Sequence, residues 1–162
     1  MQALMKINFI LQVIFKKTYQ MRQDFRCDCP FTSALDILGD KWILVIIKQM
    51  LIEGKETFKD FAESEEAIAT NILSAKLKFL EEVGIVIKTK RPGNKKTNLY
   101  LLTEKGLALT PILVELATWS DAHLRDLHPT IVNGESMESL RNDKTAFAKA
   151  LDKKYREKLA VN

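Results

Sequence analysis

The hydrophobic pattern of the chain changes its period twice between residues 69 and 103. In the first part, Leu73, Leu77 and Leu80 recur at helical spacing, and this pattern ends at Gly84. Two runs rich in β-branched residues follow, IVIKTK and NLYLLT, on either side of a turn with the sequence RPGNKKT. This order predicts a helix over residues 70–82 and then a β-hairpin whose loop spans residues 91–97.

One face of the predicted hairpin is expected to pack on the core. Ile85, Ile87, Leu99 and Leu101 alternate with other residues, which is the pattern of a half-buried strand pair. The segment GKETF, residues 54–58, is also β-permissive and could add a short third strand.

Three helices are predicted upstream of this unit. Pro30 opens the first, PFTSALDIL, which places Leu35 and Leu38 on one face. Asp40 can cap the second, KWILVIIKQMLIE, which is apolar almost all round and therefore central to the core. Thr57 is a suitable N-cap for the third, FKDFAE, because its hydroxyl can accept from an amide two or three residues on.

Thr103 caps a long helix predicted over residues 104–127, in which Pro111 predicts a kink or break near Thr110. Its apolar positions form a stripe that we expect to be a dimer interface, with packing on the same chain as the alternative. These positions are Leu109, Ile112, Leu113, Leu116 and Trp119.

The tail begins with a linker at residues 129–134, which contains Pro129 and Gly134. A last helical stripe follows, and it is too short to form a core of its own. We expect it to dock on the body or across a dimer through Leu140, Phe147, Leu151, Tyr155 and Leu159.

The first twenty residues carry a short apolar run at residues 7–15. A signal peptide would need a small-residue cleavage site after the run, but Lys16 and Lys17 come at once. An amphipathic helical arm is favoured, and a natural start at Met21 is the other reading that the residues leave open. With no apolar run of the ~18–20 residues that a membrane span needs, we expect a cytoplasmic protein.

The composition suits one globular domain with arms, since 46% of the 162 residues are hydrophobic. The net charge of +4 is concentrated in residues 70–98, which hold seven basic side chains against Glu81 and Glu82. Residues 1–69 and 99–162 are close to neutral. A concentrated positive patch suits a polyanion such as DNA, although a Lys-rich solvated loop has the same composition.

The helix over residues 70–82 presents a short, polar side away from its apolar face. Small hydrogen-bonding side chains of this kind reach base edges in the major groove, whereas an ordinary solvated helix face would look similar. The candidates for base contacts are Thr70, Asn71, Ser74 and Ala75. The candidates for contacts with the DNA backbone are Lys76, Lys78, Lys88, Lys90, Arg91, Lys95 and Lys96.

From about residue 29 to residue 121 the chain resembles the HxlR-type family of bacterial winged helix-turn-helix transcription regulators, which are relatives of the MarR regulators. The matching motifs are Cys29-Pro30, LGDKW with Gly39 and Trp42, Phe58 in TFKDF, Leu73-Ser74 with Leu77 and Leu80, LEEVGIV, YLLTEKG with Gly106, and residues 111–119. Their order and spacing over some ninety residues carry the resemblance.

The resemblance implies a mainly α fold with a small β-hairpin wing, a winged helix-turn-helix flanked by N- and C-terminal helical dimerisation extensions. We expect a helical arm over residues 1–26, the HxlR-type domain over 27–128, and a linker with a C-terminal helix over 129–162. It also implies a homodimer on double-stranded DNA, with helix 70–82 in the major groove and wing 91–97 on flanking DNA. This chain departs from the family at Thr57, where Arg is frequent, and at Ala67-Ile68-Ala69, where Gly-Ile-Ser is common. Ala69 removes a cap or phosphate ligand, for which Thr70 could substitute.

Cys29 matches a cysteine with which several members of the family sense oxidants or electrophiles. The helix dipole after Pro30 would favour its thiolate, whereas the neighbouring Asp28 would raise its pKa. Cys27 lies too close for an unstrained bridge, so oxidation would link two subunits. An inert cysteine is the alternative. An oxidant or small-molecule effector is therefore compatible with the sequence, but no metal-ligand spacing, catalytic constellation or cofactor motif is present.

The sequence thus predicts a sequence-specific, dimeric DNA-binding transcription regulator, not an enzyme, with no cofactor and no membrane partner. The alternative is a winged-helix protein–protein interaction module without DNA binding. A thiol-reactive sensor whose output is not transcription is a second rival.

Overall fold

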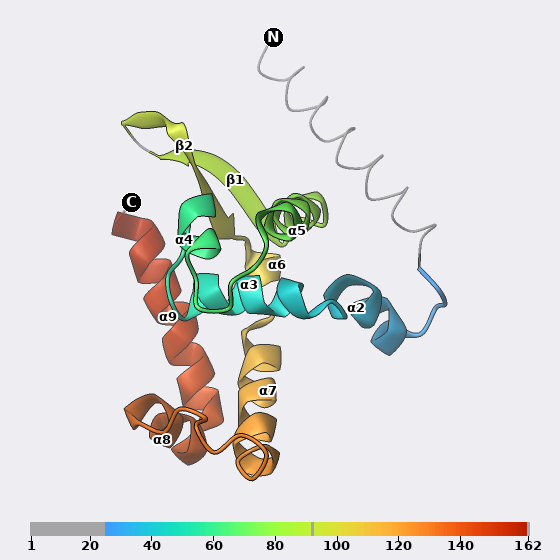
Figure 1. Ribbon diagram of the computed structural model, residues 1–162, viewed down its shortest axis with the longest axis vertical. Coiled ribbons are helices and arrows are strands. Elements are labelled where there is room, and N and C mark those ends of the chain that lie inside the picture. Colours follow the sequence, from blue (N-terminus) through green and yellow to red (C-terminus); the bar gives the residue numbers. More distant parts are fainter. Residues whose placement is uncertain (1–24, 92, 162) are drawn as a thin grey trace.

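The computed structural model describes residues 25–91 and 93–161 (Figure 1). The predicted arm over residues 1–26 and its alternatives therefore lie almost wholly outside the described residues. Among the residues described, no helix is long and apolar enough to cross a membrane.

The first two described helices follow the sequence prediction. They are α2 (Pro30–Leu38) and α3 (Lys41–Leu51). Asp40 is the N-cap of α3, and its Oδ1 accepts a hydrogen bond of 2.9 Å from the amide of Trp42. As its apolar pattern predicts, α3 is central to the core, and the side chains of Ile43, Ile46 and Ile47 are almost fully buried.

Two further helices form the helix-turn-helix, α4 (Phe58–Ala62) and α5 (Thr70–Glu82). Thr57 and Asp60 form a reciprocal capping box at the start of α4, which confirms the predicted cap. α5 buries Leu73, Leu77 and Leu80, as its helical spacing predicts.

The hairpin consists of the antiparallel strands β1 (Val86–Arg91) and β2 (Asn94–Leu102), which pair Val86 with Leu102 and Ile87 with Leu101. The predicted inward face was wrong at Ile87, which is 51% exposed, while Val86 and Leu102 are buried in the core. Ile85 is buried in the turn before the strand, where its amide donates to the carbonyl of Leu80. The inward-facing positions of β1 therefore begin one residue later than the apolar alternation suggests, whereas Leu99 on β2 is buried as predicted.

The segment GKETF forms no strand in the structure. Its one ladder-like contact is the carbonyl of Glu56, which accepts a 2.7 Å hydrogen bond from the amide of Tyr100. The sheet of the described residues is accordingly two-stranded.

Pro111 breaks the predicted long helix into α6 (Glu104–Leu107) and α7 (Thr110–His123), as expected. Thr103 caps α6 by accepting from the amide of Gly106. The tail then folds into α8 (Glu135–Asn142) and α9 (Lys144–Val161).

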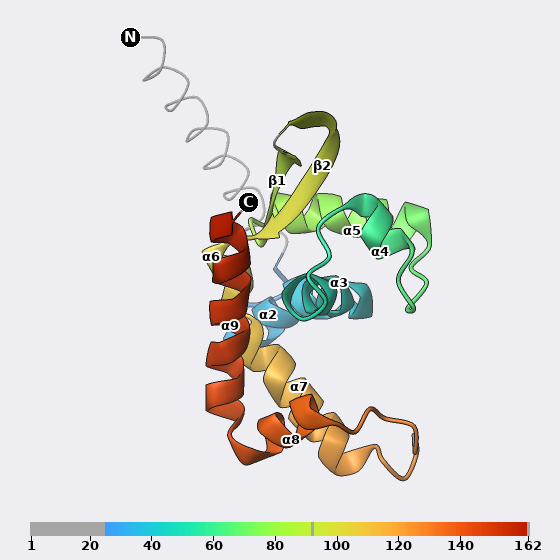
Figure 2. The ribbon, with the colours of Figure 1, turned by 90° about the vertical axis from the view of Figure 1, so that its left-hand side faces the viewer.

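The C-terminal helices dock on the body of their own chain. α9 packs along α7 and reaches α3, and it buries Leu151 and Tyr155 (Figure 2). α5 and the hairpin lie at one end of the molecule and α8 lies at the other (Figures 1 and 2).

Candidate nucleic-acid interface

The turn between α4 and α5 is fastened to the central helix. Glu66 accepts hydrogen bonds from Lys48 and, at 2.7 Å, from the fully buried Gln49. Burial raises the pKa of Glu66, but these donors outweigh it and lower the pKa to about 2. The sequence pattern shows only an acidic linker here, and the partners on α3 become visible only in three dimensions.

The four candidate base-contacting residues lie on the solvent side of α5. Thr70, Asn71, Ser74 and Ala75 are all exposed, and so is Lys78. Because the leucines of the helix face inward, this short polar side is the part of α5 that a groove can accept.

The start of α5 has no side-chain cap. Ala69 occupies the N-cap position and Thr70 is the first helical residue, so the substitution of Thr70 for a missing cap is not observed. Amides in an uncapped first turn have no intrahelical acceptor, and a phosphate oxygen is a suitable partner for them.

Lys76 differs from the other candidate cations of α5. Its Nζ lies 2.8 Å from Oδ2 of Asp40, the N-cap of α3. This contact with Lys76 lowers the pKa of Asp40. Lys76 is thus partly engaged inside the chain, whereas Lys78 is exposed.

The basic residues of the hairpin sit on long strands rather than on the predicted loop. Arg91 pairs with Asn94, so most of residues 91–97 belong to strands. Gly93 has φ +73°, a conformation that favours glycine and closes the hairpin tightly. A register shift beside Arg91 makes residues 95–97 a bulge, and this irregularity leaves no mark in a hydrophobic pattern.

The cations of the hairpin make weak contacts or none with acidic groups. Nζ of Lys90 donates to Asn98, and Nζ of Lys88 lies 5.8 Å from the centre of the Tyr100 ring. Arg91 and Lys96 are exposed. No ion pair joins these four cations to an acid within the described residues, although the charge of Arg91 helps to lower the pKa of Asp60. Their charge is therefore largely available to a polyanion.

The apolar stripe of α7 divides into two parts. Ile112, Leu116 and Trp119 are 42%, 46% and 56% exposed, and they recur at the spacing of one helix face. Leu109 is half-buried, and Leu113 lies in the chain's own core. Phe31 and Leu35 of α2 are also exposed, whereas Leu38, which the helical pattern places on the same face as Leu35, is half-buried.

Cys27 and Cys29 are both exposed free thiols at the start of α2. Hydrogen bonding from the amide and hydroxyl of Thr32 lowers the pKa of Cys29, and the amide of Phe31 adds to the effect. The lowered pKa of Cys29 agrees with its position at the N-terminus of α2 and is opposite to the raised pKa expected from the neighbouring Asp28. In residues 25–91 and 93–161, no group of three His, Cys, Asp or Glu side chains could hold a metal ion.

A short helix, a turn, an exposed polar helix and a basic hairpin together define a winged helix-turn-helix. The HxlR-like helix-turn-helix family matches residues 37–128, more than half of the chain. The protein therefore belongs to the HxlR-type family of transcription regulators, which confirms the resemblance and the predicted fold class.

Three similar proteins illustrate the match. An uncharacterized HTH-type transcriptional regulator of Bacillus subtilis strain 168, YvaP, is 37% identical over 93 residues, which cover 57% of this chain and 85% of YvaP. The crystal structure of PA1607 has a TM-score of 0.59 at 31% identity and covers 67% of this chain and 73% of that one. The redox regulator HypR in its oxidized form has a TM-score of 0.52 at 31% identity, and the match covers 59% of this chain and 97% of the HypR chain.

Proposed function

We propose that this HxlR-type regulator acts as a homodimer in the cytoplasm and binds an operator through one α5 and one hairpin from each subunit. Thr70, Asn71, Ser74 and Ala75 contact bases in the major groove. Lys78, Lys88, Lys90, Arg91, Lys95 and Lys96 contact phosphates, and Lys76 joins them when it leaves Asp40. Two observations together carry the proposal: the exposed side of α5 is uncharged in its N-terminal half, and the hairpin cations form no ion pair among the described residues. α5 and the hairpin lie at the same end of the molecule (Figure 2).

The dimer forms through the exposed part of the α7 stripe. Ile112, Leu116 and Trp119 are exposed apolar side chains at the spacing of one helix face, and grouped exposed apolar side chains of this kind often mark protein–protein contacts. The half-buried Leu109 lines its edge, whereas Leu113 supports the face from inside. Double-stranded DNA and a second copy of the chain are thus the partners, and the protein regulates rather than catalyses.

Oxidants or electrophiles control DNA binding through Cys29. Its exposure and lowered pKa both increase the thiolate fraction on which thiol reactivity depends. HypR, a similar protein by sequence and fold, is a redox regulator. Cys27, also exposed, supplies the second thiol for a bridge between subunits.

Selection of bound duplexes from genomic fragments, with and without an oxidant such as diamide, tests the proposal. We expect enrichment of one sequence with two related half-sites, and its loss under oxidant in the native protein but not in the Cys29→Ser variant. A protein–protein interaction module would enrich no sequence and would show no salt-dependent affinity for any duplex.

A further inference from the structure

One face of α9 contacts three consecutive elements. Asp152, Tyr155 and Arg156 share this face because they are three and four residues apart. The hydroxyl of Tyr155 accepts a 2.8 Å hydrogen bond from the amide of Leu102 at the end of β2. Both Nη atoms of Arg156 donate to Glu104 of α6, at 2.6 and 2.7 Å.

The third contact lies at the break between α6 and α7. Oγ1 of Thr110 is 2.5 Å from Oδ1 of Asp152 and 2.8 Å from the carbonyl oxygen of Leu107. Pro111 has no N–H to offer that carbonyl, and Thr110 can donate its single hydroxyl proton either to the Leu107 carbonyl or to the Asp152 carboxylate. Two helices joined at a proline can bend relative to each other. Asp152 of α9 contacts the chain at this point, between α6 and α7.

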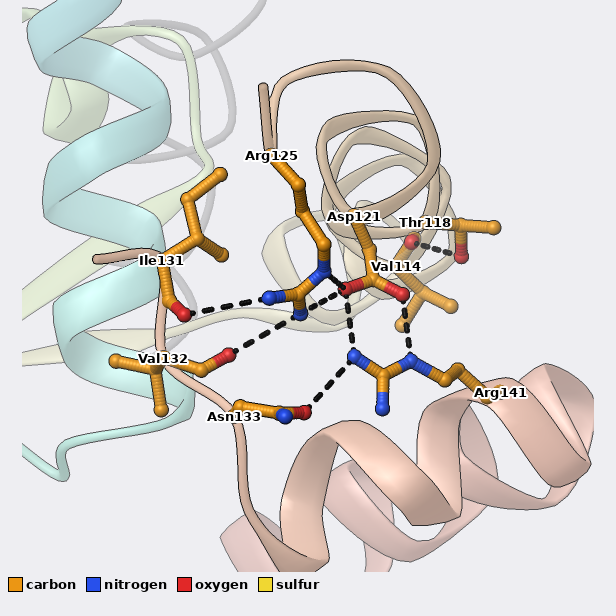
Figure 3. A network of polar contacts seen from close by, with 8 residues as sticks. All are labelled: Val114, Thr118, Asp121, Arg125, Ile131, Val132, Asn133 and Arg141. Carbon is orange, nitrogen blue, oxygen red and sulfur yellow. Dashed lines mark hydrogen bonds and ion pairs between the residues drawn. The ribbon is translucent and has the colours of Figure 1, made fainter. Parts of the chain in front are cut away.

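The C-terminal helices are also fastened on both sides of the break. On the far side, Arg141 of α8 makes a two-pronged contact with Asp121 near the end of α7, at 2.7 and 2.9 Å (Figure 3). Arg125 also donates to Asp121 and ties in the linker through the carbonyl of Ile131. On the near side, Nζ of Lys158 contacts Glu56 at 2.7 Å and the carbonyl of Gly54 at 2.5 Å.

We infer that α8 and α9 act as a splint that fixes the angle between α7 and the winged helix-turn-helix, and that this angle determines which half-site spacing the dimer accepts. Asp152, Tyr155 and Arg156 are the specificity-determining residues of this device. The inference rests on the proposed function, in which α7 forms the dimer. Residues 129–162, which contain α8 and α9, lie outside the region that matches the family.

The physical basis is the helical geometry of DNA. One added base pair turns a half-site by about 35° around the duplex axis, since a turn holds about 10 base pairs. If the angle between α7 and α5 is rigid, both α5 helices of a dimer can enter their half-sites without strain at only one half-site spacing. A dimer with a hinge at Pro111 follows the half-site and tolerates several spacers.

The first experiment measures the angle inside one chain and needs no DNA. Spin labels are placed at Ala122→Cys on α7 and Thr89→Cys on β1, in a Cys27→Ser, Cys29→Ser background and diluted with unlabelled protein. The splint variant combines Asp152→Ala, Tyr155→Phe and Arg156→Ala, which removes one charge of each sign and keeps the buried ring. The control combines Lys153→Ala and Glu157→Ala, an exposed ion pair on the same helix.

We expect a narrow distance distribution in the wild-type background and the control, and a distribution at least about twice as wide in the splint variant. Equal widths in a splint variant that retains its circular dichroism spectrum overturn the inference, whatever the DNA experiments show. A splint variant that loses the native spectrum is replaced by Arg156→Ala alone, and equal widths there overturn it in the same way.

The second experiment uses duplexes with two copies of the selected half-site and spacers that differ by single base pairs. We expect the wild type and the control to prefer one spacer, and the splint variant to lose at least about fivefold of that preference while its affinity for one half-site is unchanged. An unchanged spacing profile overturns the inference. A wild type that binds no duplex contradicts the proposed function instead, while the distance measurement still decides whether the splint exists.

Discussion

The hairpin region and α9 carry similar charge but use it differently. Residues 70–98 hold seven basic and two acidic side chains, and residues 144–161 hold six and two. In α9, Lys144, Arg156 and Lys158 pair with acids on other elements. On the hairpin, Lys88, Lys90, Arg91 and Lys96 form no ion pair with an acid among the described residues, although the charge of Arg91 helps to lower the pKa of Asp60. Paired charge holds a fold together, and unpaired charge is what a polyanion can attract.

The largest expected effect tests whether α9 serves stability. Tyr155 is buried and its hydroxyl serves a buried amide, so Tyr155→Ala should lower the free energy of unfolding by about 3–5 kcal/mol. Ile87→Ala on the half-exposed face of the hairpin should lower it by less than ~1 kcal/mol. Urea denaturation measures the free energy of unfolding of both variants. A similar decrease for the two would show that α9 stabilises the fold no more than the exposed face of the hairpin does.

The next effect concerns DNA affinity. Removing three unpaired cations in a Lys90→Ala, Arg91→Ala, Lys96→Ala variant should weaken binding to all duplexes by roughly 10–100-fold and flatten the salt dependence by about three counterions. Fluorescence anisotropy at several salt concentrations measures the slope. Removing Lys144, Lys153 and Lys158 of α9 instead, each of which pairs with an acid, deletes the same charge and should leave the slope unchanged. An equal change in slope for both variants would show that total charge, rather than unpaired charge, governs binding.

A smaller and more selective effect is expected at the exposed side of α5. Asn71→Ala should weaken binding to the selected operator by about 1–3 kcal/mol and leave binding to random duplexes nearly unchanged, because a base contact carries sequence information. Competition experiments with the operator and with random duplexes separate the sequence-specific from the nonspecific part of the binding free energy. Equal weakening on both would reassign Asn71 to the DNA backbone.

The smallest effect concerns a paired charge within the helix-turn-helix itself. The pKa of Glu66 is lowered from 4.5 to about 2, so its contribution to stability is present above pH 4.5 and is lost as the pH falls toward 2. Glu66→Gln should cost about 1 kcal/mol at pH 7, a value reduced by the partial exposure of this carboxylate, and the difference from the wild type should shrink at low pH. Urea denaturation between pH 7 and pH 3 checks this, and a constant difference would exclude the ion pair as its source.

Local signals in the sequence were sufficient for most of the helices. Asp40, Thr57 and Thr103 cap helices as predicted, and Pro111 breaks the long helix where expected, since each effect depends on neighbours within about four residues. Leu73 and its helical partners are buried for the same reason. The inward face of the hairpin was predicted correctly at Ile85 and Leu99 but wrongly at Ile87, because Ile85 is buried in the turn before the strand and the inward positions of β1 start at Val86.

The site was less accessible to sequence reasoning because it depends on which charges meet. Lys76 is placed correctly on α5, yet its contact with Asp40 joins residues far apart in the chain. The positive charge of α9 does not appear in the net charge of residues 99–162, because the acidic residues between 99 and 143 cancel it. The contacts of Asp152 and Arg156 that define the splint could not be found without the fold.

The uncapped start of α5 has a consequence for dynamics. With Ala69 as the N-cap residue, the amides of the first turn have no side-chain acceptor and should exchange their hydrogens with solvent rapidly in the free protein. A bound phosphate would protect them, so the operator itself would complete the helix. The Ala69→Ser variant should exchange these amide hydrogens more slowly in the free protein, and its free energy of unfolding should rise by about 1 kcal/mol. Because these amides would then already be bonded, DNA binding should slow their exchange by a smaller factor than in the wild type.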